Sequence, residues 1–193
     1  MPLHRALDQI AQKEGFRSWS HLSAIATRAA PADTVLSSLH PGDMVLIGAR
    51  PGQGKTRLGL ELATLAPGIG RVGFFFTLDF HTRDISDQVA ALGLMHSKEA
   101  SDVVLDTSDD ICADHIIAAL NGRGAQALIV VDYLQLLDQK RTHPSLEAQM
   151  AALAAFTRTH EAICIVISQI DRAFDLSGKT MPDLSDVRLP YPL

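Results

Sequence analysis

One glycine-rich stretch, residues 48–56, constrains the fold of this 193-residue chain more than any other. It follows the apolar run 44–47 and precedes residues 57–65, where leucines fall on one helical face. A strand, a glycine turn and a helix in this order form a phosphate site, because the helix N-terminus presents unpaired N–H groups and positive dipole charge. The stretch departs from the motif G-x-x-x-x-G-K-[ST] only at its first position, which is Ala49. It therefore predicts a phosphate-binding loop, and the alternative is a chance glycine-rich turn.

The motif assigns roles to its polar residues. Lys55 is expected to reach the β- and γ-phosphates of a nucleotide, and the Thr56 hydroxyl to hold Mg²⁺. The residues expected to bind the nucleotide are Ala49, Arg50, Pro51, Gly52, Gln53, Gly54, Lys55, Thr56 and Arg57.

Composition excludes several classes of protein. The 47% apolar share is ordinary for a globular core, no apolar run approaches the length of a membrane span, and the N-terminus lacks the apolar segment of a secretory signal. Cys112 and Cys164 lie in apolar patterns without metal-ligand spacing, which indicates reduced core residues in a cytoplasmic protein. The net charge of −5 argues against broad, non-specific nucleic-acid binding but leaves room for a local basic patch.

The chain is expected to have two parts, a helical segment at residues 1–32 and a core at residues 33–193. Two helical patterns run through residues 3–30, and Pro31-Ala32-Asp33 is typical of a linker. Phe16 and Trp19 are expected to clamp the helical pair together or onto the core, and the alternative is a docking surface for a partner.

The core alternates apolar runs with amphipathic helices, which implies an α/β fold with a mostly parallel sheet covered by helices on both faces. The expected strands are 44–47, 71–76, 103–105, 127–131 and 163–167. The expected helices are 57–65, 84–94, 111–120 and 146–159.

Three further polar residues follow apolar runs, and ligands of a parallel sheet bind beyond the carboxyl ends of its strands. Asp132 is expected to hold Mg²⁺ or its water, and the alternative is a helix-capping Asp. Asp79 is a candidate general base for the attacking water, or else a solvated loop carboxylate. Gln169 is expected to sense the γ-phosphate, or else to be a satisfied strand-end amide. The predicted catalytic residues are Lys55, Asp79, Asp132 and Gln169, and the predicted metal ligands are Thr56 and Asp132.

Basic residues supply two more hypotheses. An arginine that meets the transferring phosphoryl group can accelerate hydrolysis greatly, and the candidates are Arg50, Arg57, Arg172 and Arg188. The compact basic loop 140–143 is either a solvated loop or a contact for a nucleic-acid backbone.

Five segments resemble, in order, those of DnaB-type replicative helicases. Residues 49–56 resemble the Walker A motif of that family with its Ala-Arg-Pro opening, and residues 129–136 closely match its Walker B motif, Ile-Asp-Tyr-Leu-Gln-Leu. Residues 74–80, 167–172 and 184–188 resemble its Phe-Phe-Ser-Leu-Glu-Met, Leu-Ser-Gln-Leu-Asn-Arg and Ser-Asp-Leu-Arg segments. The resemblance implies a RecA-like P-loop NTPase core, ATP and Mg²⁺ as ligands, and a hexameric ring with ATP bound between subunits.

The departures from the family limit the expected activity. Asp79 stands where the family has its catalytic glutamate, and its side chain is one methylene shorter. The sequence stops soon after Arg188, so we expect it to lack the later strands that carry the trans-acting arginine. Residues 3–30 do not resemble the primase-interacting domain of the family.

These observations predict an ATP-binding RecA-like protein that is a weak or partner-stimulated ATPase, acting with single-stranded DNA or the replication machinery. A homo-oligomer is expected, a membrane is not, and processive unwinding is not expected of the chain alone. The alternative is a non-hydrolysing, nucleotide-dependent protein that regulates a helicase ring. A small-molecule kinase would need an arginine-bearing lid and an acceptor pocket, for which the sequence gives no sign.

Overall fold

The computed structural model describes residues 7–8, 12, 17–19, 31–78, 103–120, 122–138, 140 and 142–187. The expected helix 84–94, the residues Asp79 and Arg188, and most of segment 3–30 lie outside these ranges. The chain divides into two compact units, Met1–Ser38 and Leu39–Leu193. The predicted boundary after residue 32 stays a prediction.

The first unit contains helix α3 (Pro31–Ser38), at residues where a linker was expected to begin. Pro31 suits the first helical position because its fixed φ is already helical, and Asp33 in the first turn interacts favourably with the helix dipole. Ala32 and Leu36, four residues apart, are both buried. The linker prediction for residues 31–33 was therefore wrong, because three residues are too short to reveal helical periodicity.

Trp19 also belongs to this unit. Its side chain is 40% exposed, and its backbone N–H donates a hydrogen bond to Asp8 Oδ1 at 2.8 Å. Phe16, its predicted partner in clamping the helices, lies outside the described residues.

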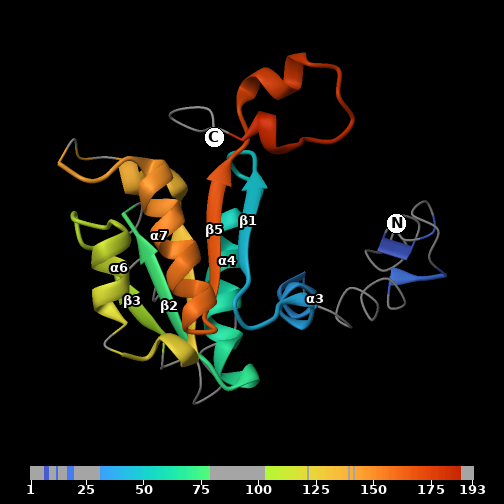
Figure 1. Cartoon of the computed structure of the whole chain (residues 1–193). Helices are drawn as coiled ribbons and strands as arrows, with labels where there is room; N and C mark the ends of the chain where they lie inside the picture. The colour runs from blue at the N-terminus through green and yellow to red at the C-terminus, as the bar shows by residue number, and fades with distance from the viewer. Residues whose placement is uncertain are drawn as a thin grey trace. The chain divides into compact units, whose positions relative to one another are not determined.

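The second unit is built on a five-stranded parallel sheet with the strand order β1-β5-β4-β2-β3 (Figure 1). The strands are β1 (Met44–Ala49), β2 (Val72–Thr77), β3 (Val104–Asp106), β4 (Ala127–Asp132) and β5 (Ile163–Gln169). All five predicted strands are confirmed, and each ends slightly later than predicted.

Helices cover both faces of this sheet, as predicted. Helix α4 (Lys55–Leu65) lies on one face, and α6 (Ala113–Ala119) and α7 (Leu146–Thr159) lie on the other (Figure 1). Helix α7 begins after Ser145, whose hydroxyl accepts a hydrogen bond from the Ala148 N–H at 3.3 Å. Short 3₁₀ helices complete the described part: η1 (Ala66–Ile69), η4 (Gly124–Gln126), η5 (Leu134–Asp138), η6 (Arg172–Leu176) and η7 (Leu184–Asp186).

The three consecutive phenylalanines of β2 show why the strands are continuous apolar runs. Phe74 and Phe76 belong to the core shared with α6 and α7, whereas Phe75 lies on the α4 side, beside Gly59. All three are 1% exposed. Side chains alternate along a strand, so a strand that is buried on both faces needs apolar residues at every position.

Helix α4 lies unusually close to the sheet because two glycines face the contact. A Cβ atom added to Gly59 would lie 2.5 Å from Ile167 Cδ1, and one added to Gly73 would lie 2.0 Å from the backbone oxygen of Ala63. The second clash is with backbone, which cannot move without shifting the helix. The position of α4 therefore depends on the absence of a side chain at Gly73.

Both cysteines are free thiols, as predicted. Cys164 is fully buried in β5, and burial raises the pKa of its thiol to about 12, although a hydrogen bond with Thr157 lowers it in part. Cys112 is half-buried at the start of α6.

Among the described residues, no helix combines the length and the apolar character needed to cross a membrane.

We expect Gly73→Ala to destabilise the protein by about 1–3 kcal/mol or more, because the added methyl group overpacks the contact between α4 and β2. Gly68→Ala is the matched control, since a Cβ there meets no atom within 4 Å, and it should change the free energy of unfolding by less than about 0.5 kcal/mol. Urea unfolding measures both, and equal stability of the two variants would contradict the close packing.

We expect Cys164 to resist a maleimide in the native protein, because the thiolate is the nucleophile and its raised pKa leaves little of it at mildly alkaline pH. The variant Cys112→Ser isolates this thiol. Mass spectrometry should find the native variant unlabelled and the urea-unfolded variant labelled. Rapid labelling of the native variant would show that the core around β5 opens.

Candidate functional site

The loop between β1 and α4 takes its shape from two glycines and one glutamine. Gly52 and Gly54 have φ angles of +78° and +77°, which glycine adopts without strain. Gln53 closes the loop, because its side-chain Oε1 accepts from the Arg50 N–H at 3.0 Å while its backbone N–H donates to the Arg50 carbonyl at 3.2 Å. A Cβ added at either glycine would meet no atom within 4 Å, so the space beside the loop is open to a ligand.

Helix α4 begins at Lys55 without a side-chain cap, since the capping residue is Gly54. The N–H groups of its first turn therefore have no side-chain acceptor there, and no acidic residue occupies that turn. Lys55 and Thr56 are half-buried, and neither side chain bonds to another described residue. This arrangement of open N–H groups, dipole charge and a lysine suits an anion, and a phosphate in particular.

Asp132 is the last residue of β4 and is completely buried. It lies in register with Thr77 at the end of β2 and with Ile167 on β5, and the peptide bond that follows it is cis. The described residues include no group of three or more His, Cys, Asp or Glu side chains that could hold a metal. The carboxylate of Asp132 and the hydroxyl of Thr56 are ligand types that suit Mg²⁺, which keeps waters and takes further ligands from substrate phosphates.

Gln169 ends β5 directly beside the glycine loop. It lies in register with Ala49, and the next residue, Ile170, donates its N–H to the Ala49 carbonyl at 3.1 Å. Its half-buried side chain lines a cavity of about 450 Å³ together with Pro51 and Arg172. In Figure 1 the loop after β1 and the segment after β5 lie at the same end of the sheet. The structure thus brings Gln169 to the loop that precedes Lys55.

The arginine candidates occupy different surroundings. The Nε of Arg57 lies 3.0 Å from Glu61 Oε1 on α4, and its side chain is 68% exposed. Arg50 forms an ion pair with Asp175, whereas Arg172 is exposed and pairs with no other described residue. Arg188, like the predicted base Asp79, stays a prediction outside the described ranges.

The basic loop after η5 is tied to an acidic side chain. Lys140 Nζ lies 2.6 Å and His143 Nε2 lies 3.1 Å from Asp110 Oδ1. Hydrogen bonds from Lys140 and then His143 hold the pKa of Asp110 below its usual value. Nearby, His115 Nε2 lies 2.8 Å from Asp106 Oδ2 at the end of β3. In the described part of the loop, Lys140 and His143 therefore both contact the same carboxylate.

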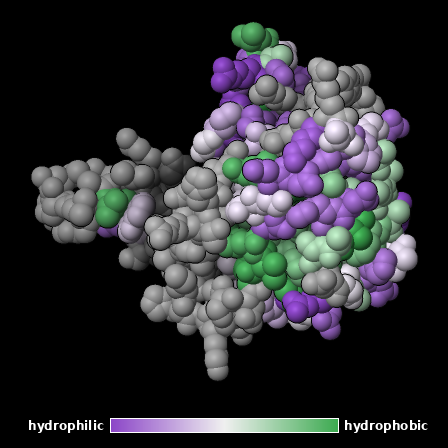
Figure 2. Space-filling view, turned by 90° about the vertical axis from the view of Figure 1, so that its left-hand side faces the viewer, coloured by the Kyte–Doolittle hydropathy of each residue, from purple (hydrophilic) through white to green (hydrophobic). Residues whose placement is uncertain are grey.

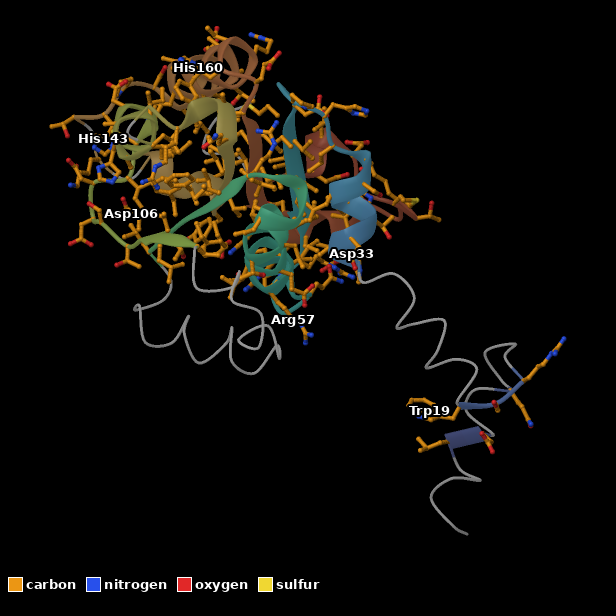
Figure 3. All side chains as sticks on the ribbon, turned by 90° about the horizontal axis from the view of Figure 1, so that it is seen from below. Trp19, Asp33, Arg57, Asp106, His143 and His160 are labelled. Atoms are coloured by element: carbon orange, nitrogen blue, oxygen red, sulfur yellow. The ribbon has the colours of Figure 1, made fainter. Side chains whose placement is uncertain are left out.

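These ion pairs lie away from the phosphate loop. Figure 3 shows Asp106 and His143 on one side of the unit and Arg57 of α4 on another. Much of the face seen in Figure 2 is hydrophilic, around smaller apolar areas. The ion pairs of Asp110 and Asp106 are therefore separate from the candidate site.

Three features of the site were not predicted from the sequence. Gln135 Nε2 lies 3.4 Å from Ser168 Oγ and links the segment after β4 to β5. Gln53 braces its own loop, and Asp175 reaches Arg50 from η6. Among these residues, only Gln135 had a sequence signal, because it lies in the Tyr-Leu-Gln-Leu segment. The Arg50–Asp175 pair spans 125 positions, and nothing in the sequence connects the two residues.

Comparisons with known proteins identify the relationship. The chain is 24% identical over 203 residues to the replicative DNA helicase DnaB of Leifsonia xyli subsp. xyli, covering 86% of this chain and 43% of that protein. A solved DnaB-like replicative helicase, studied with primase, superposes with a TM-score of 0.61 at 19% identity, over 97% of this chain and 57% of that one. A KaiC-like protein from Pyrococcus horikoshii OT3 gives a TM-score of 0.53 at 18% identity, over 67% and 62% of the two chains. No model of a known protein family matches the chain.

The chain is related to the RecA-like domains of DnaB-type replicative helicases. The predicted fold class, an α/β RecA-like P-loop fold with a parallel sheet, is confirmed. The chain spans less than half the length of the curated DnaB that it matches. What a DnaB-type helicase does as a whole protein therefore enters only as a proposal.

Proposed function

We propose that the chain binds ATP with Mg²⁺ at residues 49–57 and is a weak or partner-stimulated ATPase that acts with DNA or the replication machinery. The observation that carries this proposal is the uncapped start of α4, where Lys55 and Thr56 have no other described partner. A bound anion stabilises a half-buried lysine at a helix N-terminus, where the dipole charge is positive as well. The relation to DnaB-type helicases supports a nucleotide as that anion.

Each residue of the site then has a task. The first-turn N–H groups of α4 and the Lys55 ammonium bind the β- and γ-phosphate oxygens. Thr56 and Asp132 would hold Mg²⁺, which when bound neutralises charge that develops on the phosphates. Gln169, held beside the loop by the pairing of β5 with β1, donates its amide to the γ-phosphate and responds to its loss.

Slow turnover follows from the residues available for chemistry. Asp79 is our proposed general base, and its side chain is shorter than the glutamate of the family. Arg50 pairs with Asp175, and we assign it to holding the loop in place of neutralising the transferring phosphoryl group. We propose that a second subunit or a partner supplies that positive charge, as in other phosphoryl-transfer proteins. A homo-oligomer, in which the site lies between subunits, is part of this proposal.

A second candidate is a nucleotide-dependent interaction protein that regulates a helicase ring without hydrolysing ATP. One observation favours it. Leu176, Met181 and Leu184 are 90%, 78% and 74% exposed, and all three lie in residues 171–187 after β5. Large exposed apolar side chains gathered in one segment are typical of a surface that contacts another protein.

We expect Lys55→Ala to weaken ATP binding by about ten- to a hundredfold, because charge-assisted hydrogen bonds contribute about 1.5–3 kcal/mol. Isothermal calorimetry with ATP and Mg²⁺ measures the loss. Lys140→Ala removes the same side chain far from the loop and is the matched control. Equal affinities for the wild-type protein and Lys55→Ala would refute the proposed phosphate site.

We expect the isolated protein to hydrolyse ATP more slowly than about 1 s⁻¹, the lower end of ordinary enzyme turnover. Turnover and molecular mass should be measured together, with and without single-stranded DNA. Stimulation by DNA together with assembly supports the ATPase. ATP binding without turnover under every condition, combined with co-assembly with a DnaB-type helicase, supports the interaction protein instead.

A further inference from the structure

We propose that Asp175 is a positioning residue for the phosphate loop and that it acts through Arg50. This inference rests on the proposed function, because it concerns the loop that we expect to bind ATP. It assigns Arg50 to holding the loop in shape, which is a different task from contacting the phosphoryl group.

The side chain of Arg50 leaves the loop toward η6. Its Nη1 forms an ion pair with Asp175 Oδ1, and its Cζ lies 6.0 Å from the centre of the Phe174 ring. Arg50 and Asp175 side chains are each 43% exposed, so water screens the pair in part. The aromatic face adds a cation–π contact to the same guanidinium group. Two neighbouring residues of η6 therefore hold one side chain of the loop.

The backbone of Arg50 transmits this restraint to the rest of the loop. Its N–H donates to the Gln53 side chain, and its carbonyl accepts from the Gln53 N–H. Gln53 directly precedes Gly54, the capping residue of α4. Holding Arg50 thus restrains the residues that set the direction of the first helical N–H groups.

The other end of the pair is also firmly held. Asp171 caps η6 by accepting from the Ala173 N–H at 2.8 Å, and its own N–H donates to the Asp186 carbonyl at 2.7 Å. Asp186 is buried, and its carboxylate lies 2.9 Å from Lys179 Nζ. Residues 171–187 are therefore folded on themselves. Asp175 therefore lies in a segment that has its own internal hydrogen bonds.

A cavity of about 380 Å³ lies between the two elements, lined by Arg50, Pro51, Gln53, Ile170, Arg172 and Asp175. Because apolar packing does not fill this space, the ion pair and the ring contact are the side-chain links across it in the described part of the chain. Breaking them frees the loop to sample other conformations, and ATP binding must then order it again, which lowers affinity.

The test compares ATP binding by calorimetry in Asp175→Asn, Asp175→Glu, Arg50→Ala and the double variant Arg50→Ala/Asp175→Asn. We expect Asp175→Asn and Arg50→Ala each to weaken ATP binding about two- to fivefold, the range expected for a partly exposed ion pair. The double variant should be no weaker than either single variant, and Asp175→Glu should restore affinity. If Arg50 contacts phosphate instead, Arg50→Ala will weaken binding while Asp175→Asn leaves it unchanged or tightens it, which overturns the proposal.

Hydrogen exchange of the loop amides separates this inference from the proposed function. Asp175→Asn should speed exchange of the hydrogen-bonded N–H groups of Arg50 and Gln53 in the nucleotide-free protein, whether or not ATP binds. Failure of the wild-type protein to bind ATP would refute the proposed function alone, whereas unchanged loop exchange in Asp175→Asn would refute the positioning role. Asp183→Asn is the control, because it removes an ion pair of Lys179 within the same segment without contacting the loop. An equal effect of Asp183→Asn would mean that general loosening of residues 171–187 is the cause, and it too would overturn the proposal.

Discussion

The close contact between α4 and the sheet determines where every other part of the site can lie. Gly59 and Gly73 remove the side chains that would otherwise separate helix from strands, so α4 rests against Ile167 and the backbone at Ala63 rests against β2. A helix held this closely has little freedom to slide or rotate. Its first turn is therefore fixed just beyond the end of β1, and the short loop of residues 50–54 has to reverse the chain in a small space. The two positive φ angles in that loop follow from this constraint.

The parallel sheet explains why residues distant in sequence meet at this place. Hydrogen bonding between neighbouring strands sets Ala49 beside Gln169 and Thr77 beside Asp132. Since all strands point the same way, every strand end reaches the same edge as the start of α4. Burial then limits which charged groups are stable at this edge. A carboxylate with no exposed surface, such as Asp132, is costly to bury unless it is compensated by polar partners or a cation.

The strands were predictable from the sequence because their signals are local, and a run such as 127–131 is apolar at each position. Helix α3 was missed because its burial involves only Ala32 and Leu36, too few positions to show a period. The link between Arg50 and Asp175 lay beyond sequence reasoning, since nothing in either irregular segment marks the other as its partner. The motif suggested that an arginine beside a phosphate loop would contact phosphate. In the folded chain the guanidinium group of Arg50 instead contacts the carboxylate of Asp175 and the ring of Phe174. Only the three-dimensional path of the residues after β5 reveals these contacts.

Ion pairs within the chain also limit any contact with DNA, because a cation that already has an acidic partner is less available to phosphate. In the described part of the chain, three basic side chains already have acidic partners: Lys140 pairs with Asp110, Lys179 with Asp186, and Arg50 with Asp175. Arg172 and Lys55 pair with no other described residue. Water screens the exposed members of these pairs, so a phosphate backbone can compete for the cations. Each such exchange nevertheless gives up an existing ion pair, and the acidic partner that remains repels the phosphate. DNA binding that draws on these cations would therefore be weak. An oligomer repeats each weak contact on several subunits. This raises the overall affinity for DNA without a stronger contact in any one chain.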